Sequence, residues 1–342
     1  MRAISITLIL IHHLSDYSDI KIYDLNNYGI QINLSVINNI MRLMSIGVFI
    51  FISAYLLESN KITSIYNFIK SKFIRIFPLY YCSLLLFIIL YYDFSRDIGL
   101  ISLLIHMAGV QLIFASRYCE PIITLWFVGL ITAYYGFYLL ISMFEKKPGI
   151  YISLILIIPI IIILIKASFD FTDKKLLFYY PIFIMGILFK KYNIFNKINN
   201  KIILLLILIF MLSVTIYSVS IYPLIYFTIN KPPLFSILGF NALVFSNIII
   251  LSFSILLFCF SNLIKKYKLF CLFEKIAYSS FCIYLFHRPI FSLLVFLYDP
   301  FDDLIRILYL IFFGLPLACI SSYYIQKIYD LFFIPILKKR TI

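Results

Sequence analysis

Long apolar runs alternate with short polar segments along almost the whole chain. Runs of this length with few charged residues are typical of helices that cross the hydrocarbon core of a membrane, for which about 20 residues are needed. The sequence therefore predicts an all-α, polytopic membrane protein. Its apolar segments lie at about residues 2–18, 40–57, 76–92, 98–115, 122–143, 150–166, 176–189, 202–222, 236–260, 277–297 and 304–334.

The composition excludes a soluble domain. Of the 342 residues, 63% are hydrophobic and 13% are charged, whereas soluble chains carry about 25% charged residues. The net charge of +14 lies in short clusters between apolar runs, as in cytoplasmic loops, so no nucleic acid partner is expected. The six cysteines lack paired spacings and lie mostly inside apolar runs, which favours buried free thiols over disulfides or a metal site.

The distribution of basic residues predicts the topology. If segment 98–115 does not cross, the basic clusters at 70–75, 190–201 and 265–275 share one side of the membrane. If it does cross, the two later clusters face opposite to the first. The positive-inside rule therefore favours ten spans in the cell membrane, both termini in the cytoplasm, and 98–115 as an interfacial or re-entrant segment. We expect one membrane domain over residues 1–342.

The first apolar segment carries Arg2, His12, His13 and Asp16. On a helix, Arg2 and His13 are separated by about 1100°, so they share a face within about 20° and lie about 16 Å apart. His12 points about 100° away from that face. With Arg2 at the membrane surface, His13 lies near the middle of the membrane, where an ionisable residue indicates function. The alternative is a helix-end arginine with a buried, hydrogen-bonded histidine.

Further motifs follow in a characteristic order. The second span contains Ser53-Ala54-Tyr55, and the third begins with a basic segment that leads into an aromatic-proline turn. The later motifs are Leu125-Trp126-Phe127, Phe183-Ile-Met-Gly186 and Tyr284-Leu285-Phe286-His287. Over about residues 2–330 this order resembles the membrane-bound acyltransferase type 3 family, O-acetyltransferases that modify cell-envelope and exported polysaccharides.

The chain matches most of the family pattern and departs from it at two positions. Matching residues are Arg2 and His13 with ten residues between them, Ser53 and Tyr55, Arg75, and the late Tyr284, Leu285 and His287. Ala54 replaces a glycine in the second span, and Lys72 replaces the first arginine of Arg-x-x-Arg. The lysine keeps the charge but loses the bidentate fork of a guanidinium.

The resemblance implies an acyl transfer from acyl-coenzyme A, most often acetyl-coenzyme A, to a hydroxyl of a glycan or glycolipid. His13 is the candidate catalytic base, because an ordinary pKa near about 6.5 suits proton transfer at neutral pH. Asp16, one turn further on, either orients His13 or caps the helix. Arg2, Lys72 and Arg75 are candidates to hold the donor phosphates, or they are ordinary cytoplasmic charges. No permanently bound cofactor and no metal are expected.

The remaining candidates have mainly structural interpretations. Close helix packing by Ser53-Ala54 is favoured over a nucleophilic role for Ser53. Tyr55 is a possible site residue or a structural one. Trp126 either anchors the outer interface or stacks on a sugar. His287, with the adjacent Arg288 and the motif residue Tyr284, is either a second site group or part of a structural polar pair, and the structural interpretation is favoured.

Two other functional classes fit a polytopic chain of this composition. One is a flippase or transporter for a lipid-linked oligosaccharide, or the related polymerases. The other is a catalytically inactive member of the family that the chain resembles. Polymerases usually carry a long outer loop, and flippases usually have more spans. Neither polymerases nor flippases explain the Arg2–His13 spacing together with Lys72 and Arg75.

Overall fold

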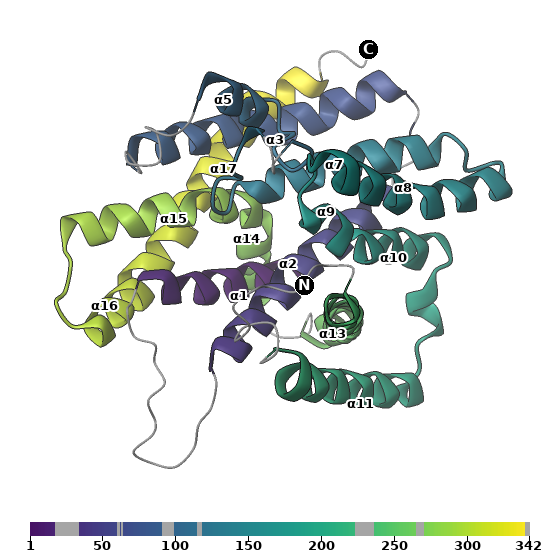
Figure 1. The fold of residues 1–342 in the computed structure, drawn as a ribbon. Helices are drawn as coiled ribbons and strands as arrows, with labels where there is room; N and C mark the ends of the chain where they lie inside the picture. Colours follow the sequence, from purple (N-terminus) through teal and green to yellow (C-terminus); the bar gives the residue numbers. More distant parts are fainter. Residues whose placement is uncertain are drawn as a thin grey trace. The chain divides into compact units, whose positions relative to one another are not determined.

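The structure, a computed structural model, describes residues 1–17, 34–59, 62, 64–90, 99–114, 118–222, 236–264 and 270–338. Within these ranges every regular element is helical, which confirms the all-α prediction (Figure 1). The elements are α1 (Arg2–Leu14), η1 (Ser15–Tyr17), α2 (Leu34–Glu58), α3 (Ile65–Leu90), α5 (Leu100–Met107), α7 (Trp126–Ser142), α8 (Pro148–Phe169), α9 (Lys174–Phe178), α10 (Tyr180–Lys191), η3 (Ile194–Lys197), α11 (Asn200–Ile216), η4 (Tyr217–Ile221), α13 (Ile237–Ile264), α14 (Phe270–Tyr278), α15 (Ser280–Leu297), α16 (Asp303–Tyr309), η5 (Leu310–Gly314) and α17 (Leu315–Lys338).

Polar residues set several of the helix starts. The side chains of Asp173, Asn199 and Asp302 accept hydrogen bonds from backbone N–H groups in the first turns of α9, α11 and α16. Such N-caps satisfy donors that a helix cannot pair internally. Pro148 opens α8, where its missing N–H costs nothing. Short polar segments therefore separate the long apolar helices, as the sequence pattern predicts.

Seven helical stretches in the described part of the chain are long and apolar enough to cross a membrane. They are Val36–Glu58, Ile65–Leu90, Pro148–Phe169, Asn200–Ile221, Ile237–Ser261, Ser280–Leu297 and Asp303–Phe333, and shorter apolar helices cover Arg2–Leu14 and Trp126–Ser142. The chain is therefore a polytopic membrane protein, as predicted. The total of ten spans stays a prediction.

Segment 98–115 contains only one helix in its described residues, α5, which has eight residues. A helix of that length extends about 12 Å, much less than the hydrocarbon core of about 30 Å. Turns follow, and Gly109 adopts a left-handed φ of 68°, where a Cβ atom would lie 2.8 Å from the Phe77 ring. This geometry agrees with the interpretation that the segment does not cross.

His106 connects α5 to the segments around it. The Tyr80 hydroxyl donates to the His106 carbonyl oxygen at 2.9 Å, and Tyr81 donates to the Met107 carbonyl oxygen at 3.0 Å. The buried His106 ring accepts a hydrogen bond at 3.3 Å from the backbone N–H of Ile122. His106 therefore joins α5 to α3 and to the chain before α7.

The chain divides into two compact units. The first contains Met1–Glu58 and Met185–Tyr324, and the second contains Ser59–Ile184 and Ile325–Ile342. In the first unit α1 packs against α2, α14 and α15, and α13 packs against α2 and α11. A single domain over the whole chain stays a prediction. Most of the segment 19–39 between the first two apolar runs, and Lys265, Lys266 and Lys268 of the basic cluster at 265–275, lie outside the described residues.

Small residues allow close helix contact in the first unit. Ala54 in α2 is fully buried, and a Cβ atom on Gly186 in α10 would lie 2.5 Å from the Phe51 carbonyl oxygen and 2.7 Å from the Ala54 Cβ. Only a glycine permits this approach of the two backbones. The contact supports the helix-packing interpretation of Ser53-Ala54.

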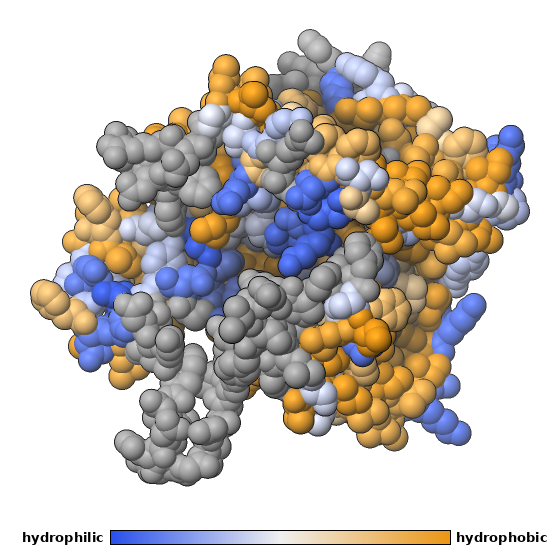
Figure 2. All heavy atoms as spheres, in the orientation of Figure 1, coloured by the Kyte–Doolittle hydropathy of each residue, from blue (hydrophilic) through white to orange (hydrophobic). Residues whose placement is uncertain are grey.

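Two helices expose broad apolar surfaces (Figure 2). On α8 the exposed side chains include Ile157, Ile160, Ile161 and Leu164, and on α11 they include Leu204, Leu205, Leu208, Met211 and Leu212. In water such surfaces would be unfavourable, because their apolar side chains are not covered by other residues of the same unit. They are suited to contact with lipid chains.

Candidate functional site

A cluster of ionisable side chains lies inside the first unit, where α1 packs against α15. His13 ends α1, Asp16 follows in η1, and α15 contributes His287 and Arg288. His287 is completely buried and Arg288 is 8% exposed. Charged and polar groups in apolar helices are costly and usually functional, so this cluster is the candidate site.

Asp16 lies within hydrogen-bond distance of His13, one helical turn earlier in the chain. Asp16 Oδ2 is 2.8 Å from His13 Nδ1, which is the contact that an orienting carboxylate would make. Arg288 Nη2 forms an ion pair with the same oxygen and lies 2.8 Å from His13 Nδ1. Three groups therefore converge, two from the start of the chain and one from α15.

Two tautomers of neutral His13 are compatible with these contacts. Arg288 has only N–H donors, and an ionised carboxylate only accepts, so Nδ1 either donates to Asp16 or accepts from Arg288. With the proton on Nδ1 and donated to Asp16, the lone pair of Nε2 is available to act as a base.

Asp16 lies beyond the last residue of α1 and its side chain is 40% exposed. Its ion pair with Arg288 favours the charged form of this carboxyl.

His287 carries an unused acceptor next to His13. Its Nδ1 lies 3.0 Å from the Ile283 carbonyl oxygen and 2.9 Å from that of Tyr284, so Nδ1 holds the proton. Its Nε2 is buried and has no hydrogen-bond partner among the described residues. The ring stacks on the His13 ring with centroids 5.1 Å apart. A buried acceptor without a donor is unfavourable, and an O–H group bound beside His13 would satisfy it.

Tyr17 links the segment after α1 to α15. Its hydroxyl lies 2.9 Å from Ser292 Oγ and donates to the Arg288 carbonyl oxygen at 3.2 Å. Arg306 donates to the Tyr17 carbonyl oxygen at 3.3 Å and forms ion pairs with Asp299 and Asp303 at 2.6 and 3.0 Å. These contacts fix the backbone that carries Asp16.

His12 and His13 have different neighbours, as the helix geometry predicts. His12 Nδ1 lies 2.5 Å from the Asn38 side-chain oxygen on α2, whereas His13 contacts Asp16 and α15. The two rings are 4.8 Å apart. That only His13 is needed for activity stays a prediction.

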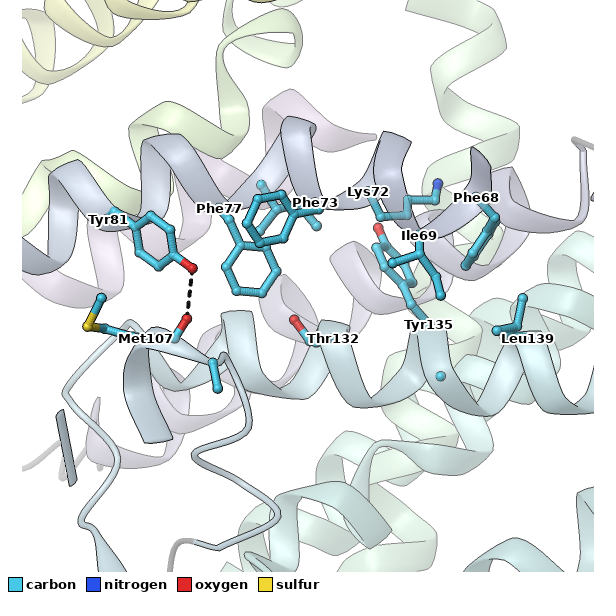
Figure 3. A pocket seen from close by; sticks show the side chains of 13 residues that line it. Phe68, Ile69, Lys72, Phe73, Phe77, Tyr81, Met107, Thr132, Tyr135 and Leu139 are labelled. Atoms are coloured by element: carbon cyan, nitrogen blue, oxygen red, sulfur yellow. Dashed lines mark hydrogen bonds between the residues drawn. The ribbon is translucent and has the colours of Figure 1, made fainter. Parts of the chain in front are cut away.

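Lys72 lines an apolar pocket of about 340 Å³ in the second unit, between α3 and α7. The lysine Nζ lies 5.3 Å from the centre of the Phe68 ring and 5.0 Å from that of Tyr135. Figure 3 shows these rings at one end of the pocket, and the hydrogen bond from Tyr81 to Met107 at the other. The pocket combines an apolar lining with one cation.

Arg75 is exposed on α3 and does not line this pocket. Arg2 is half-buried in α1 and belongs to the first unit. A joint phosphate site of Arg2, Lys72 and Arg75 stays a prediction.

The aromatic candidates lie in packed clusters. Tyr55 contacts the Phe195 ring with centroids 5.5 Å apart, and Lys190 Nζ lies 5.3 Å from its ring centre. Trp126 stacks on Tyr179 at 6.4 Å, with Lys175 Nζ 5.1 Å from its ring. Tyr284 is buried on α15, three residues before His287, and the centres of the two rings are 6.2 Å apart.

The described residues contain no group of three or more histidine, cysteine or acidic side chains placed to bind a metal. The cysteines form no disulfide in this part of the chain. Cys119 and Cys282 are buried, but Cys82 and Cys271 are exposed, so the predicted burial of the thiols holds for only some of them.

The sequence analysis names Arg288 only as the neighbour of His287, and it does not place Arg288 beside His13 and Asp16. In the structure Arg288 contacts both of these residues, and the His287 ring stacks on the His13 ring. The choice between a site role and a structural role for His287 and Arg288 stays a prediction. The available signal was an arginine in the middle of an apolar span, which is rare and usually functional.

Residues 1–326 match a family model described as an acyltransferase domain. No curated protein and no solved structure matches the chain.

Proposed function

The chain belongs to the membrane-bound acyltransferase type 3 family, and from that premise we propose that it transfers an acyl group, most often acetyl, from acyl-coenzyme A to a hydroxyl of a cell-envelope or exported glycan or glycolipid. The observation that carries this proposal is the hydrogen bond between His13 and Asp16. It orients an imidazole whose Nε2 is available as a base, as in the orienting acid and base of a catalytic triad.

In the proposed reaction, Nε2 of His13 takes the proton of the acceptor hydroxyl. The hydroxyl oxygen forms a bond to the thioester carbon, the C–S bond breaks, and the proton passes from His13 to the leaving thiolate. A positioned general base contributes about 10²–10⁴-fold to such a rate. The unused acceptor of His287 supports a substrate that brings O–H donors, as a sugar does.

For the donor we propose the face of α3 that carries Lys72 and Arg75. The two residues are three positions apart, so they lie on neighbouring parts of one helix surface. Lys72 adds a positive charge to the apolar pocket, and the apolar part of an acyl-coenzyme A arm fits beside such a charge. Arg75, being exposed, can reach a phosphate without a large desolvation cost.

Changing Arg75 to alanine should raise the apparent KM for acetyl-coenzyme A by about tenfold or more, because a charge-assisted contact to phosphate is worth about 1.5–3 kcal/mol. Lys72→Arg should be tolerated, because the charge is kept. The measurement is transfer of labelled acetyl from acetyl-coenzyme A to the glycan fraction of membranes that contain each variant.

Lys70→Ala is the matched control for the donor site, because Lys70 lies on the same helix near Tyr66 and outside the pocket. It should leave the KM unchanged. An unchanged KM in Arg75→Ala would remove the phosphate-binding role of Arg75, and membranes with the wild-type protein that transfer no label would contradict the proposed function itself.

We further propose a location in the cell membrane with both termini in the cytoplasm, from the charge distribution. Reporter fusions at Lys147, Lys197 and Lys268 should all report the cytoplasmic side, although Lys268 lies outside the described residues. A cytoplasmic signal from a fusion at Asp302 would contradict this topology.

A further inference from the structure

The guanidinium of Arg288 has contacts that the orientation of His13 does not require. Asp16 alone can fix the His13 ring through Nδ1. Arg288 nevertheless places a permanent positive charge in an apolar helix, at 8% exposure, next to both groups. Burying that charge is costly even when it is paired, which calls for a role beyond holding Asp16.

The hydrogen-bond geometry of Arg288 leaves one donor unused. A guanidinium is a planar fork, and its Nε–H and Nη2 groups lie on one edge, where they can bind two oxygens side by side. Nη2 is paired with Asp16 Oδ2. Nε is buried and has no hydrogen-bond partner among the described residues. The open position on this edge therefore lies next to the Asp16–His13 pair.

We propose that the Nε–H of Arg288 is a catalytic hydrogen-bond donor that binds the carbonyl oxygen of the thioester. This inference rests on the proposed function. When the acceptor oxygen attacks, the carbonyl π electrons move onto that oxygen, and Arg288 stabilises the resulting oxyanion. When the intermediate collapses, the electrons re-form the C=O bond, the C–S bond breaks, and the thiolate takes the proton from His13. Arg288 keeps its own proton throughout.

The positions of the donor and the base support this assignment. Nη2 of Arg288 lies 2.8 Å from His13 Nδ1, and Nε belongs to the same planar guanidinium, so the open Nε–H lies close to the imidazole. A base and an oxyanion donor must both reach one reacting carbon. The Arg288 Nε atom itself is buried, and burial strengthens a charge-assisted hydrogen bond.

Arg288→Lys separates this role from simple support of Asp16. Lysine keeps a cation that can pair with Asp16, but it has no second donor in a fixed fork. We expect kcat to fall by about 10²–10³-fold, as for the loss of one oxyanion donor, with little change in the KM for acetyl-coenzyme A. Arg42→Lys is the control, because Arg42 in the same unit is exposed and donates a hydrogen bond to the Asn39 side-chain oxygen rather than to Asp16. Near-wild-type kcat in Arg288→Lys, or a loss confined to KM, would overturn the proposal.

A second measurement needs no change at Arg288. Acetyl-coenzyme A with a ¹³C-labelled carbonyl is bound to the purified wild-type protein without acceptor, and the infrared carbonyl band is compared with that of the free thioester. A shift to lower frequency is expected, because a hydrogen bond from a cation weakens the C=O bond. A bound thioester with an unshifted band overturns the oxyanion role even if label transfer proceeds. If the protein neither binds nor transfers the acetyl group, the proposed function fails, and this inference fails with it.

Discussion

His13→Ala should abolish acyl transfer while the protein still inserts into the membrane and accumulates. Alanine removes the imidazole that lies within hydrogen-bond distance of Asp16 and that we propose as the base. The rate of transfer should fall by about 10²–10⁴-fold or more, which is the contribution of a positioned base. The helix itself should survive, because alanine is the best helix former and His13 is the second-last residue of α1.

His12→Ala is the matched control for this variant. His12 contacts Asn38 on α2, so its loss should cost some stability and leave much of the activity. The measurement is transfer of labelled acetyl to the glycan in cells with each variant, normalised to the amount of protein. Equal losses in the two variants, or a reversal of their order, would contradict the placement of catalysis at His13.

Asp16→Asn should give a loss between those of the two histidine variants. Asparagine keeps the size of the side chain but loses the charge that pairs with Arg288. Its amide can also present an N–H to His13, which would favour the tautomer with the proton on Nε2 and so block the base. In a serine protease triad, the same change lowers kcat by about 10⁴-fold, and part of that loss is expected here.

The Asp16 prediction is measured as kcat in purified membranes at saturating acetyl-coenzyme A. Asp170→Asn serves as its control, since Asp170 forms an ion pair with Lys166 on the exposed end of α8. Wild-type kcat in Asp16→Asn would show that the carboxylate only caps the end of α1, which is the alternative interpretation of this residue.

The features that sequence pattern predicts best are those set by local physics. The length of apolar runs determines which segments become long helices, and the helical repeat places Asp16 one turn after His13 and separates His12 from it. The short α5 and the left-handed Gly109 also agree with a segment that does not cross.

Contacts between distant segments could not be derived in the same way. Arg288 lies 272 residues after Asp16, and no periodicity relates the two positions. The hydropathy pattern marks Arg288 as unusual, but not as the partner of His13 and Asp16. The environment of Lys72 is a similar case, because α7 contributes the opposite wall of its pocket, including Tyr135 and Leu139. Such neighbours follow only from the packing of helices.

The central claim is that the thioester reacts beside His13, between Asp16 and the two residues of α15. The most direct measurement is a cryo-electron microscopy structure of the protein with a non-hydrolysable acetyl-coenzyme A analogue. We expect the analogue's carbonyl carbon next to His13 Nε2 and its oxygen at hydrogen-bond distance from Arg288 Nε. An analogue bound with its carbonyl remote from His13 and Arg288 would contradict the claim.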